Sequence, residues 1–188
     1  MVLRWWERLP NLPYNDDINI LTSNEHHHYF INYIDAGKNG GRVLDVYTVS
    51  GIEHSSASVT YYEPEKAREI LQSKMDGTCG CKVPAPWQAF MSLIYHALYQ
   101  KGFYSNLPSI YGNQNQRGKL YNEISKQATK LGIDVSLDME SLELFLSHND
   151  WRPPIDKLAR LSIRNEWVQS YFFPQINCEK KNMLVHLY

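Results

Sequence analysis

Apolar and polar residues alternate over short stretches in the first third of the chain, which is the pattern of half-buried strands. Asp17–Leu21 places Ile18 and Ile20 on one side, and Val43–Val49 is rich in β-branched and aromatic residues. Both segments are therefore predicted strands. Ser58–Tyr62 has the same character and predicts a third strand.

Helical spacing of apolar residues appears after the first and the third predicted strands. Ser23 is a suitable N-cap for a helix that should end at Gly37, before the glycine-rich turn at residues 37–41. Its apolar stripe would be Phe30, Ile31 and Ile34. A second helix should begin at Pro64, which suits a first turn, and bury Ala67, Ile70 and Leu71.

The second half of the chain is predicted to be mainly helical. A break rich in Gly, Cys and Pro at residues 76–86 is followed by apolar stripes at helical spacing, each ended by Gly or Pro. The predicted helices cover residues 90–102, 120–132, 139–146 and 155–167, and a tail strand follows at 183–188. The expected fold is α/β (α+β): one domain with a small mixed sheet in residues 1–82 and a helical cap in 83–188.

Charge and composition exclude several classes of protein. The 188 residues include 19 basic and 20 acidic side chains without long runs of either sign, so duplex nucleic acid is not an expected partner. Residues 1–10 lack the apolar core of a signal peptide, and no stretch approaches the ~20 apolar residues of a membrane span. A cytoplasmic protein is therefore expected.

Cysteine and histidine positions do not predict a disulfide framework or a metal centre of their own. Cys79, Cys81 and Cys178 are an odd set without a second zinc-knuckle pair, and we expect reduced thiols. Consecutive helical residues point about 100° apart, so residues 26–28, all histidines, cannot share one ion. We expect them to form a solvated helix face.

Two acids and an amide stand out on the first two predicted strands. Side chains at i and i+2 share one face of a strand, so Asp17 and Asn19 point together, and Asp45 shares a face with Tyr47. If the strands are neighbours, these oxygens converge, and clustered oxygen ligands suit Mg²⁺. The alternative is that Asp16 and Asp17 belong to a turn and that Asp45 pairs with Arg42.

Residues 16–21 (Asp-Asp-Ile-Asn-Ile-Leu), then a helix, then residues 43–46 (Val-Leu-Asp-Val), resemble the core of polymerase-β-like nucleotidyltransferases. The resemblance covers roughly residues 1–62 and implies an Asp-x-Asp pair at Asp17 and Asn19 with a third acid at Asp45, which would hold Mg²⁺. Asn19 replaces the second acid of that pair. The family's Gly-Ser turn is replaced by a segment that begins at Arg4, and Arg4 is a candidate cofactor-binding residue.

The helix predicted at residues 90–102 carries His96 and ends near Lys101. His96 should lie on one face with Ser92 and with Tyr99 or Gln100, away from the apolar stripe, and that face should also present Tyr95. With Val83–Trp87, this stretch resembles uncharacterised proteins of bacterial capsule and lipopolysaccharide gene clusters. If the fold is right, His96 is a candidate base or phosphate contact and Lys101 a candidate cofactor-binding cation. The alternative, which we favour for both residues, is a His96 hydrogen-bonded to a neighbouring carbonyl and a Lys101 that interacts with the helix dipole.

Two functions follow from these patterns. The first is Mg²⁺-dependent transfer of a nucleotidyl or phosphoryl group to a small acceptor in surface-polysaccharide synthesis, with Asp17 and Asp45 holding the metal. The second is a non-catalytic module that binds a nucleotide, a sugar or a protein through an aromatic-rich face, favoured by Asn19 and by the missing Gly-Ser turn. A structural role in a larger assembly is a further alternative, supported only by the 13 Tyr and 5 Trp of the chain.

Overall fold

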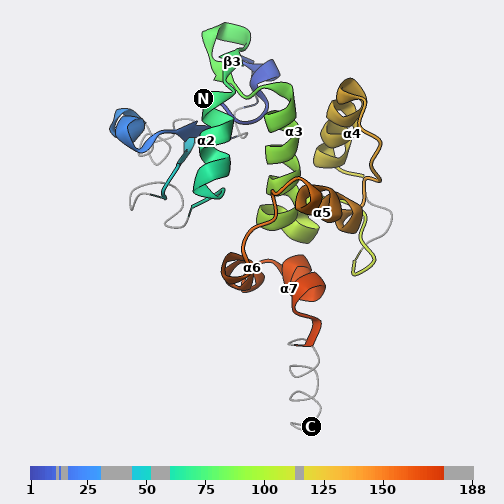
Figure 1. The fold of residues 1–188 in the computed structure, drawn as a ribbon. Coiled ribbons are helices and arrows are strands. Elements are labelled where there is room, and N and C mark those ends of the chain that lie inside the picture. Colours follow the sequence, from blue (N-terminus) through green and yellow to red (C-terminus); the bar gives the residue numbers. More distant parts are fainter. Residues whose placement is uncertain (12, 14–16, 31–43, 52–59, 113–116, 176–188) are drawn as a thin grey trace. The chain divides into compact units, whose positions relative to one another are not determined.

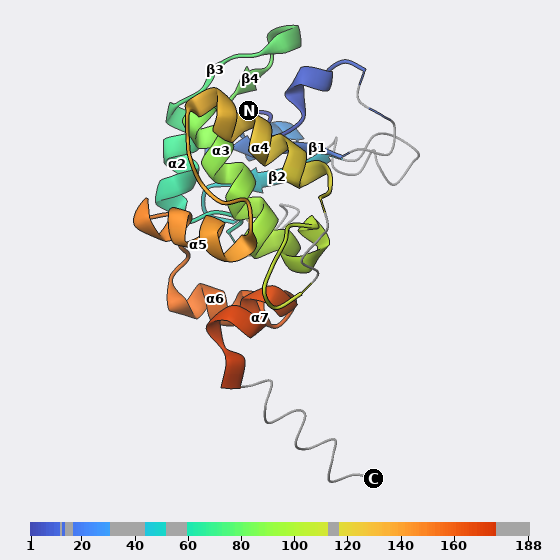
Figure 2. The ribbon, with the colours of Figure 1, turned by 90° about the vertical axis from the view of Figure 1, so that its right-hand side faces the viewer.

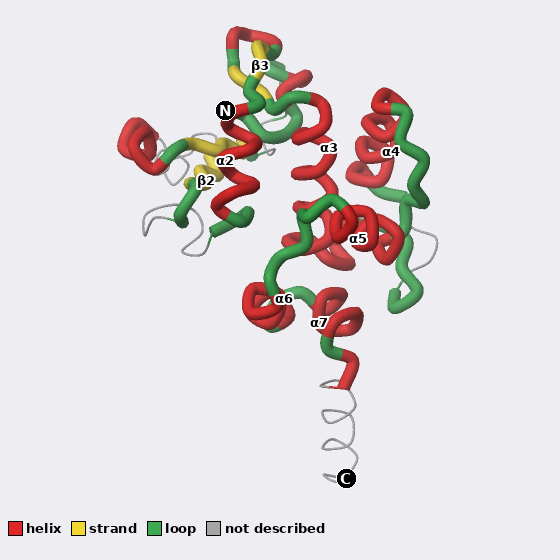
Figure 3. Tube along the Cα trace, viewed as in Figure 1, coloured by secondary structure: helices red, strands yellow, loops and turns green. Residues whose placement is uncertain are grey.

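A computed structural model describes residues 1–11, 13, 17–30, 44–51, 60–112 and 117–175 (Figure 1). The fold is mixed α+β, and the named strands of the described residues all lie before residue 84 (Figure 3). The chain divides into two compact units, Met1–Ala89 and Phe90–Tyr188, called unit 1 and unit 2 below. The predicted subdivision lies a few residues earlier, at 82/83.

The two predicted strands of the resemblance are present in unit 1 and are neighbours. β1 (Ile18–Thr22) and β2 (Leu44–Thr48) pair in parallel (Figure 2). Asn19 is aligned on Asp45 in this pairing. The first three residues pair with the other edge of β1: the Leu3 amide donates to the Asn19 carbonyl at 2.8 Å, and the Leu21 amide donates to the Met1 carbonyl at 2.9 Å. β1 therefore has backbone partners along both of its edges, β2 on one side and the first three residues on the other.

The predicted third strand is wrong for its described part. Thr60 has no regular structure, and Tyr61 and Tyr62 form a bend. Both tyrosines are buried, and their rings contact each other edge to face. Their aromatic character, which favoured a strand, instead serves side-chain packing in unit 1.

The predicted helix at Pro64 is confirmed as α2 (Pro64–Gln72). Ala67 and Ile70 are its buried residues, and α2 packs against β1. Upstream, the predicted helix after Ser23 is a 3-10 helix over its described part, η2 (Asn24–Phe30). Residues 31–43, with the rest of that prediction and the turn at 37–41, lie outside the described residues.

The histidine run only partly forms the expected solvated face. His26 and His28 are exposed, but His27 is buried at 4% exposure, which contradicts the expectation for that residue. The tighter 3-10 turn and the packing of η2 beside β2 place this side chain inward.

The Gly- and Cys-rich break contains a short hairpin that the sequence pattern did not predict. β3 (Met75–Asp76) pairs antiparallel with β4 (Lys82–Val83) around the 3-10 turn η4 (Thr78–Gly80). Gly80 has a φ of 71°, and Lys82 forms an ion pair with Asp76 across the hairpin. The Cys81 thiol donates to the Thr78 carbonyl at 3.1 Å, while Cys178 lies outside the described residues.

α3 (Pro86–Tyr95) runs from unit 1 into unit 2, where the chain continues as a π-helical segment, η5 (His96–Lys101), and a 3-10 turn, η6 (Gly102–Ser105). α4 (Lys119–Leu131) and α5 (Met139–His148) confirm the next two predicted helices. Gly132 ends α4 with a φ of 66°, as the sequence indicated.

The single helix predicted for residues 155–167 is instead two helices, α6 (Ile155–Ser162) and α7 (Glu166–Phe172), packed side by side (Figure 1). Asn165 explains the interruption. Its Oδ1 accepts the Val168 amide at 3.1 Å as the N-cap of α7, and its Nδ2 donates to the Leu98 carbonyl at 2.8 Å. The tail predicted as a strand lies outside the described residues.

The core of unit 2 contains aromatic side chains that the sequence pattern had predicted on a polar helix face. Ser92, Tyr95 and Tyr99 were expected on a polar face with His96, yet all three are buried. Tyr95 contacts Tyr99 and Trp151 edge to face. Within the described ranges, no helix combines the length and apolar character needed to cross a bilayer.

Candidate functional site

The most unusual charged group of unit 1 is Arg4, a buried arginine beside the sheet. Its side chain is 4% exposed, and its Nη2 donates to Oδ1 of Asn19 at 2.5 Å. Nη1 donates to the Tyr62 hydroxyl at 3.4 Å, and the guanidinium lies over the Tyr61 ring, 5.6 Å from its centroid. Among the described residues, these partners are all neutral.

Tyrosines surround this cation. The Tyr47 hydroxyl donates to the same Asn19 oxygen at 3.3 Å, and the Tyr47 ring packs 4.1 Å from that of Tyr61. Burial raises the pKa of Tyr47 well above its usual value, although Arg4 opposes the shift. Burial lowers the pKa of Arg4, but the effect of Tyr61, Tyr62 and Tyr47 outweighs it and the net shift is upward, so the guanidinium keeps its charge.

The three predicted metal ligands are placed unequally. Asn19 and Asp45 are aligned partners on neighbouring parallel strands, so their side chains share one face of the sheet. Asp17 is exposed and lies just before β1, and its carbonyl accepts the Asn19 Nδ2 at 3.4 Å. The Asn19 oxygen that would ligate a metal accepts hydrogen bonds from Arg4 and Tyr47. Within the described part of the chain, no three His, Cys, Asp or Glu residues form a metal-binding group.

The other two predicted site residues belong to unit 2. His96 opens the π-helical segment η5 and is half-buried. Lys101 is exposed at the end of that segment, where a cation suits the helix carbonyls. π-Helical segments occur often at functional sites, but the roles predicted for His96 and Lys101 remain predictions.

Unit 2 holds a buried carboxylate that the sequence reasoning did not select. Glu143 on α5 is fully buried and receives a forked pair from Arg152, with Nε at 2.5 Å and Nη2 at 2.7 Å. The Tyr99 hydroxyl donates to the same carboxylate at 3.3 Å. Burial raises the pKa of Tyr99, and Glu143 adds to the shift.

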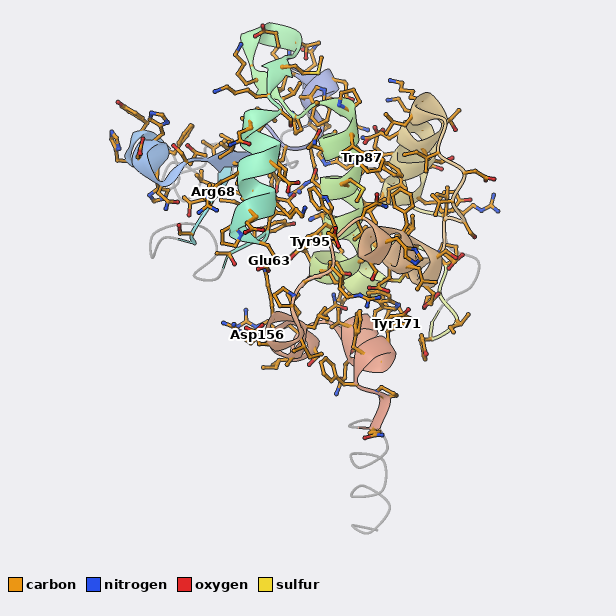
Figure 4. All side chains as sticks on the ribbon, viewed as in Figure 1. Glu63, Arg68, Trp87, Tyr95, Asp156 and Tyr171 are labelled. Carbon is orange, nitrogen blue, oxygen red and sulfur yellow. The ribbon has the colours of Figure 1, made fainter. Side chains whose placement is uncertain are left out.

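Glu140, one turn earlier on α5, organises the loop before α4. Its carboxylate accepts the Ser109 hydroxyl at 2.6 Å, the Trp167 indole at 3.1 Å and the Ile110 amide at 3.3 Å. Trp167 stacks on Tyr171 with 5.2 Å between ring centroids, and Tyr111 meets Tyr171 edge to face at 6.2 Å. This group of rings and charges lies on α5, α7 and the loop before α4, and Tyr171 is labelled in Figure 4.

A sequence signal for Glu143 did exist. It lies four residues after Met139 and three before Leu146, so it shares the buried face of α5, where an acid needs a partner. The burial of Arg4 had no such signal, because it depends on pairing between residues 1–3 and β1.

Comparisons with protein-family models, with curated proteins and with solved structures found no match to this chain. The functions proposed below therefore rest on the geometry of its own residues.

Proposed function

We propose that unit 1 is a nucleotidyltransferase-like module that binds the phosphate of a nucleotide or sugar phosphate through Arg4, without a metal ion. The observation that carries this proposal is the position of the Arg4 guanidinium on the Asn19 amide oxygen. A protein cation there performs the charge-compensating role that a metal has in the resembled family.

The surroundings of Arg4 support an anionic ligand. A buried charge is costly unless it is compensated, and the described partners of Arg4 are neutral. Arg4 donates two hydrogen bonds, and the longer one, at 3.4 Å, goes to the Tyr62 hydroxyl. A phosphate oxygen would replace this contact. Arginine suits phosphate because its planar fork matches two oxygens at once.

A second candidate is Mg²⁺-dependent nucleotidyl or phosphoryl transfer, with Asp17, Asn19 and Asp45 as ligands. The alignment of Asn19 with Asp45 across β1 and β2 favours it. A metal would have to share the Asn19 oxygen with a cationic guanidinium, and like charges at hydrogen-bonding distances repel strongly. For this reason we place the metal-independent module first.

A thermal-shift experiment on the full chain separates the two candidates. The probes are ATP, GTP, CTP, UTP and inorganic phosphate, each with EDTA and, separately, with MgCl₂. A ligand at about 100 times its Kd adds about 2.7 kcal/mol to the free energy of unfolding, which raises Tm by about 5–10 °C. We expect at least one nucleotide to raise Tm equally with EDTA and with Mg²⁺.

Arg4→Lys keeps the positive charge but loses the fork, and should greatly reduce the rise in Tm. The matched control is Arg8→Lys, because Arg8 is an exposed arginine of the same segment. A rise that requires Mg²⁺ would support the second candidate instead. No rise with any probe would contradict both.

A further inference from the structure

A platform of aromatic rings and polar groups lies on unit 2, whereas the residues of the proposed phosphate site belong to unit 1. Tyr111 is 47% exposed and contacts the half-buried Tyr171, which also packs against Phe172 at 4.8 Å. The Arg152 guanidinium lies over Phe172, 5.7 Å from the ring centroid, and its side chain is 39% exposed. Tyr111, Tyr171, Phe172 and Arg152 are called the Tyr111 platform below.

We propose that the Tyr111 platform binds a neutral saccharide, with one sugar ring stacked on Tyr111 and sugar hydroxyls hydrogen-bonded to Arg152. This is a second ligand site, independent of the function proposed for unit 1. An exposed ring beside oriented hydrogen-bonding groups is the combination that binds a ring-shaped polar ligand.

Arg152 is fixed in place for such a contact. The fully buried Glu143 carboxylate accepts hydrogen bonds from Nε and Nη2 of Arg152. Nη1 of Arg152 forms no hydrogen bond with the described residues. A buried ion pair adds little stability compared with apolar packing, so stability alone does not explain it. The pair instead presents the remaining guanidinium N–H groups in a fixed direction, which lowers the entropy cost of binding.

Charge selects a neutral ligand over an ionic one. Glu140 and Glu143 carry two negative charges and Arg152 one positive charge, so these three groups leave a surplus negative charge that disfavours an anion. A cation would need free oxygen acceptors, but Glu140 is occupied by Ser109, Ile110 and Trp167, and Glu143 by Arg152, Tyr99 and Tyr171. The groups left to the ligand are the remaining N–H donors of Arg152 and the ring faces, which suit the hydroxyls and the ring of a sugar.

Saturation-transfer NMR on the full chain tests the proposal, because it detects weak binding. The neutral probes are glucose, galactose, mannose and N-acetylglucosamine; glucuronate and choline serve as the anionic and cationic comparisons. We expect at least one neutral sugar to receive saturation, with stronger binding than glucuronate or choline. Absence of binding by all four neutral sugars, or preference for either charged probe, would overturn the proposal.

Three variants locate the site. Tyr111→Ala should raise the Kd for the bound sugar about five- to tenfold, as expected for the loss of one ring contact. Tyr104→Ala is the matched control, because Tyr104 is 86% exposed and makes no ring contact within the described residues. Arg152→Lys, which leaves Glu143 a cationic partner, should also weaken binding. Equal affinity in Tyr111→Ala and wild type would show that the sugar binds elsewhere.

Discussion

Two glycines with positive φ have different reasons to be glycine. Gly132 ends α4 at φ 66° with open space around the position of a Cβ. Gly102 has φ 54° and ψ −132°, and an added Cβ would lie 2.2 Å from Oδ1 of Asn165. At Gly132 only the backbone conformation opposes a side chain, whereas at Gly102 packing against a buried polar side chain opposes it too.

Alanine at each position separates these two effects. Gly132→Ala should lower the free energy of unfolding by about 1 kcal/mol, the cost of a left-handed non-glycine residue. Gly102→Ala should cost at least about 3 kcal/mol, because strain and displacement of Asn165 add. Urea denaturation measures both. Equal costs would show that Asn165 moves aside freely and that its bond to Leu98 contributes little.

At the scale of elements, α5 begins at a well-defined cap. The Asp138 carboxylate accepts the Ser141 amide at 2.8 Å and also the hydroxyls of Ser136 and Ser141, at 2.6 and 2.9 Å. Partial burial raises the pKa of Asp138, but these hydrogen bonds outweigh it, so the net shift is downward. The folded state therefore favours the ionised cap, and this contribution to stability is present above pH ~4.

The cap predicts a specific pH dependence. As pH falls below about 4, Asp138 becomes protonated and its contribution is lost. Asp138→Ala should lower the free energy of unfolding by about 1 kcal/mol at neutral pH, whereas Asp138→Asn keeps an accepting oxygen and should cost less. In urea denaturation from pH 7 to 3, Asp138→Asn should lose less stability than wild type. An identical loss in both proteins would rule out this role for Asp138.

Helices were predicted more accurately than strands, and for a physical reason. α2, α4 and α5 have apolar stripes at helical spacing with Pro or Gly at an end, and these signals are local. The predicted third strand and the helix at 155–167 failed because distant partners decide them: Tyr61 and Tyr62 pack around Arg4, and Asn165 bonds to Leu98.

At the scale of the whole molecule, the mixed α+β class and the strands β1 and β2 were predictable, because alternation of apolar residues defined both strands. Their pairing was only a condition of the site hypothesis, and the structure shows it. The centre of the candidate site was not. Strand alternation placed Asn19, Asp45 and Tyr47 on a common face, but it gave no information on which group would contact them. That group is Arg4, brought to β1 by backbone pairing of the first three residues.

The most direct test of this account is the sign of the effect of Asp45→Asn on nucleotide affinity, measured by isothermal titration calorimetry with EDTA present. If Arg4 binds the phosphate, removing the neighbouring carboxylate reduces repulsion, and the Kd should stay unchanged or fall. If Asp45 holds a metal, wild type should bind only when Mg²⁺ replaces EDTA, and Asp45→Asn should abolish that binding. Unchanged or tighter metal-free binding supports the account, and loss of binding in Asp45→Asn contradicts it.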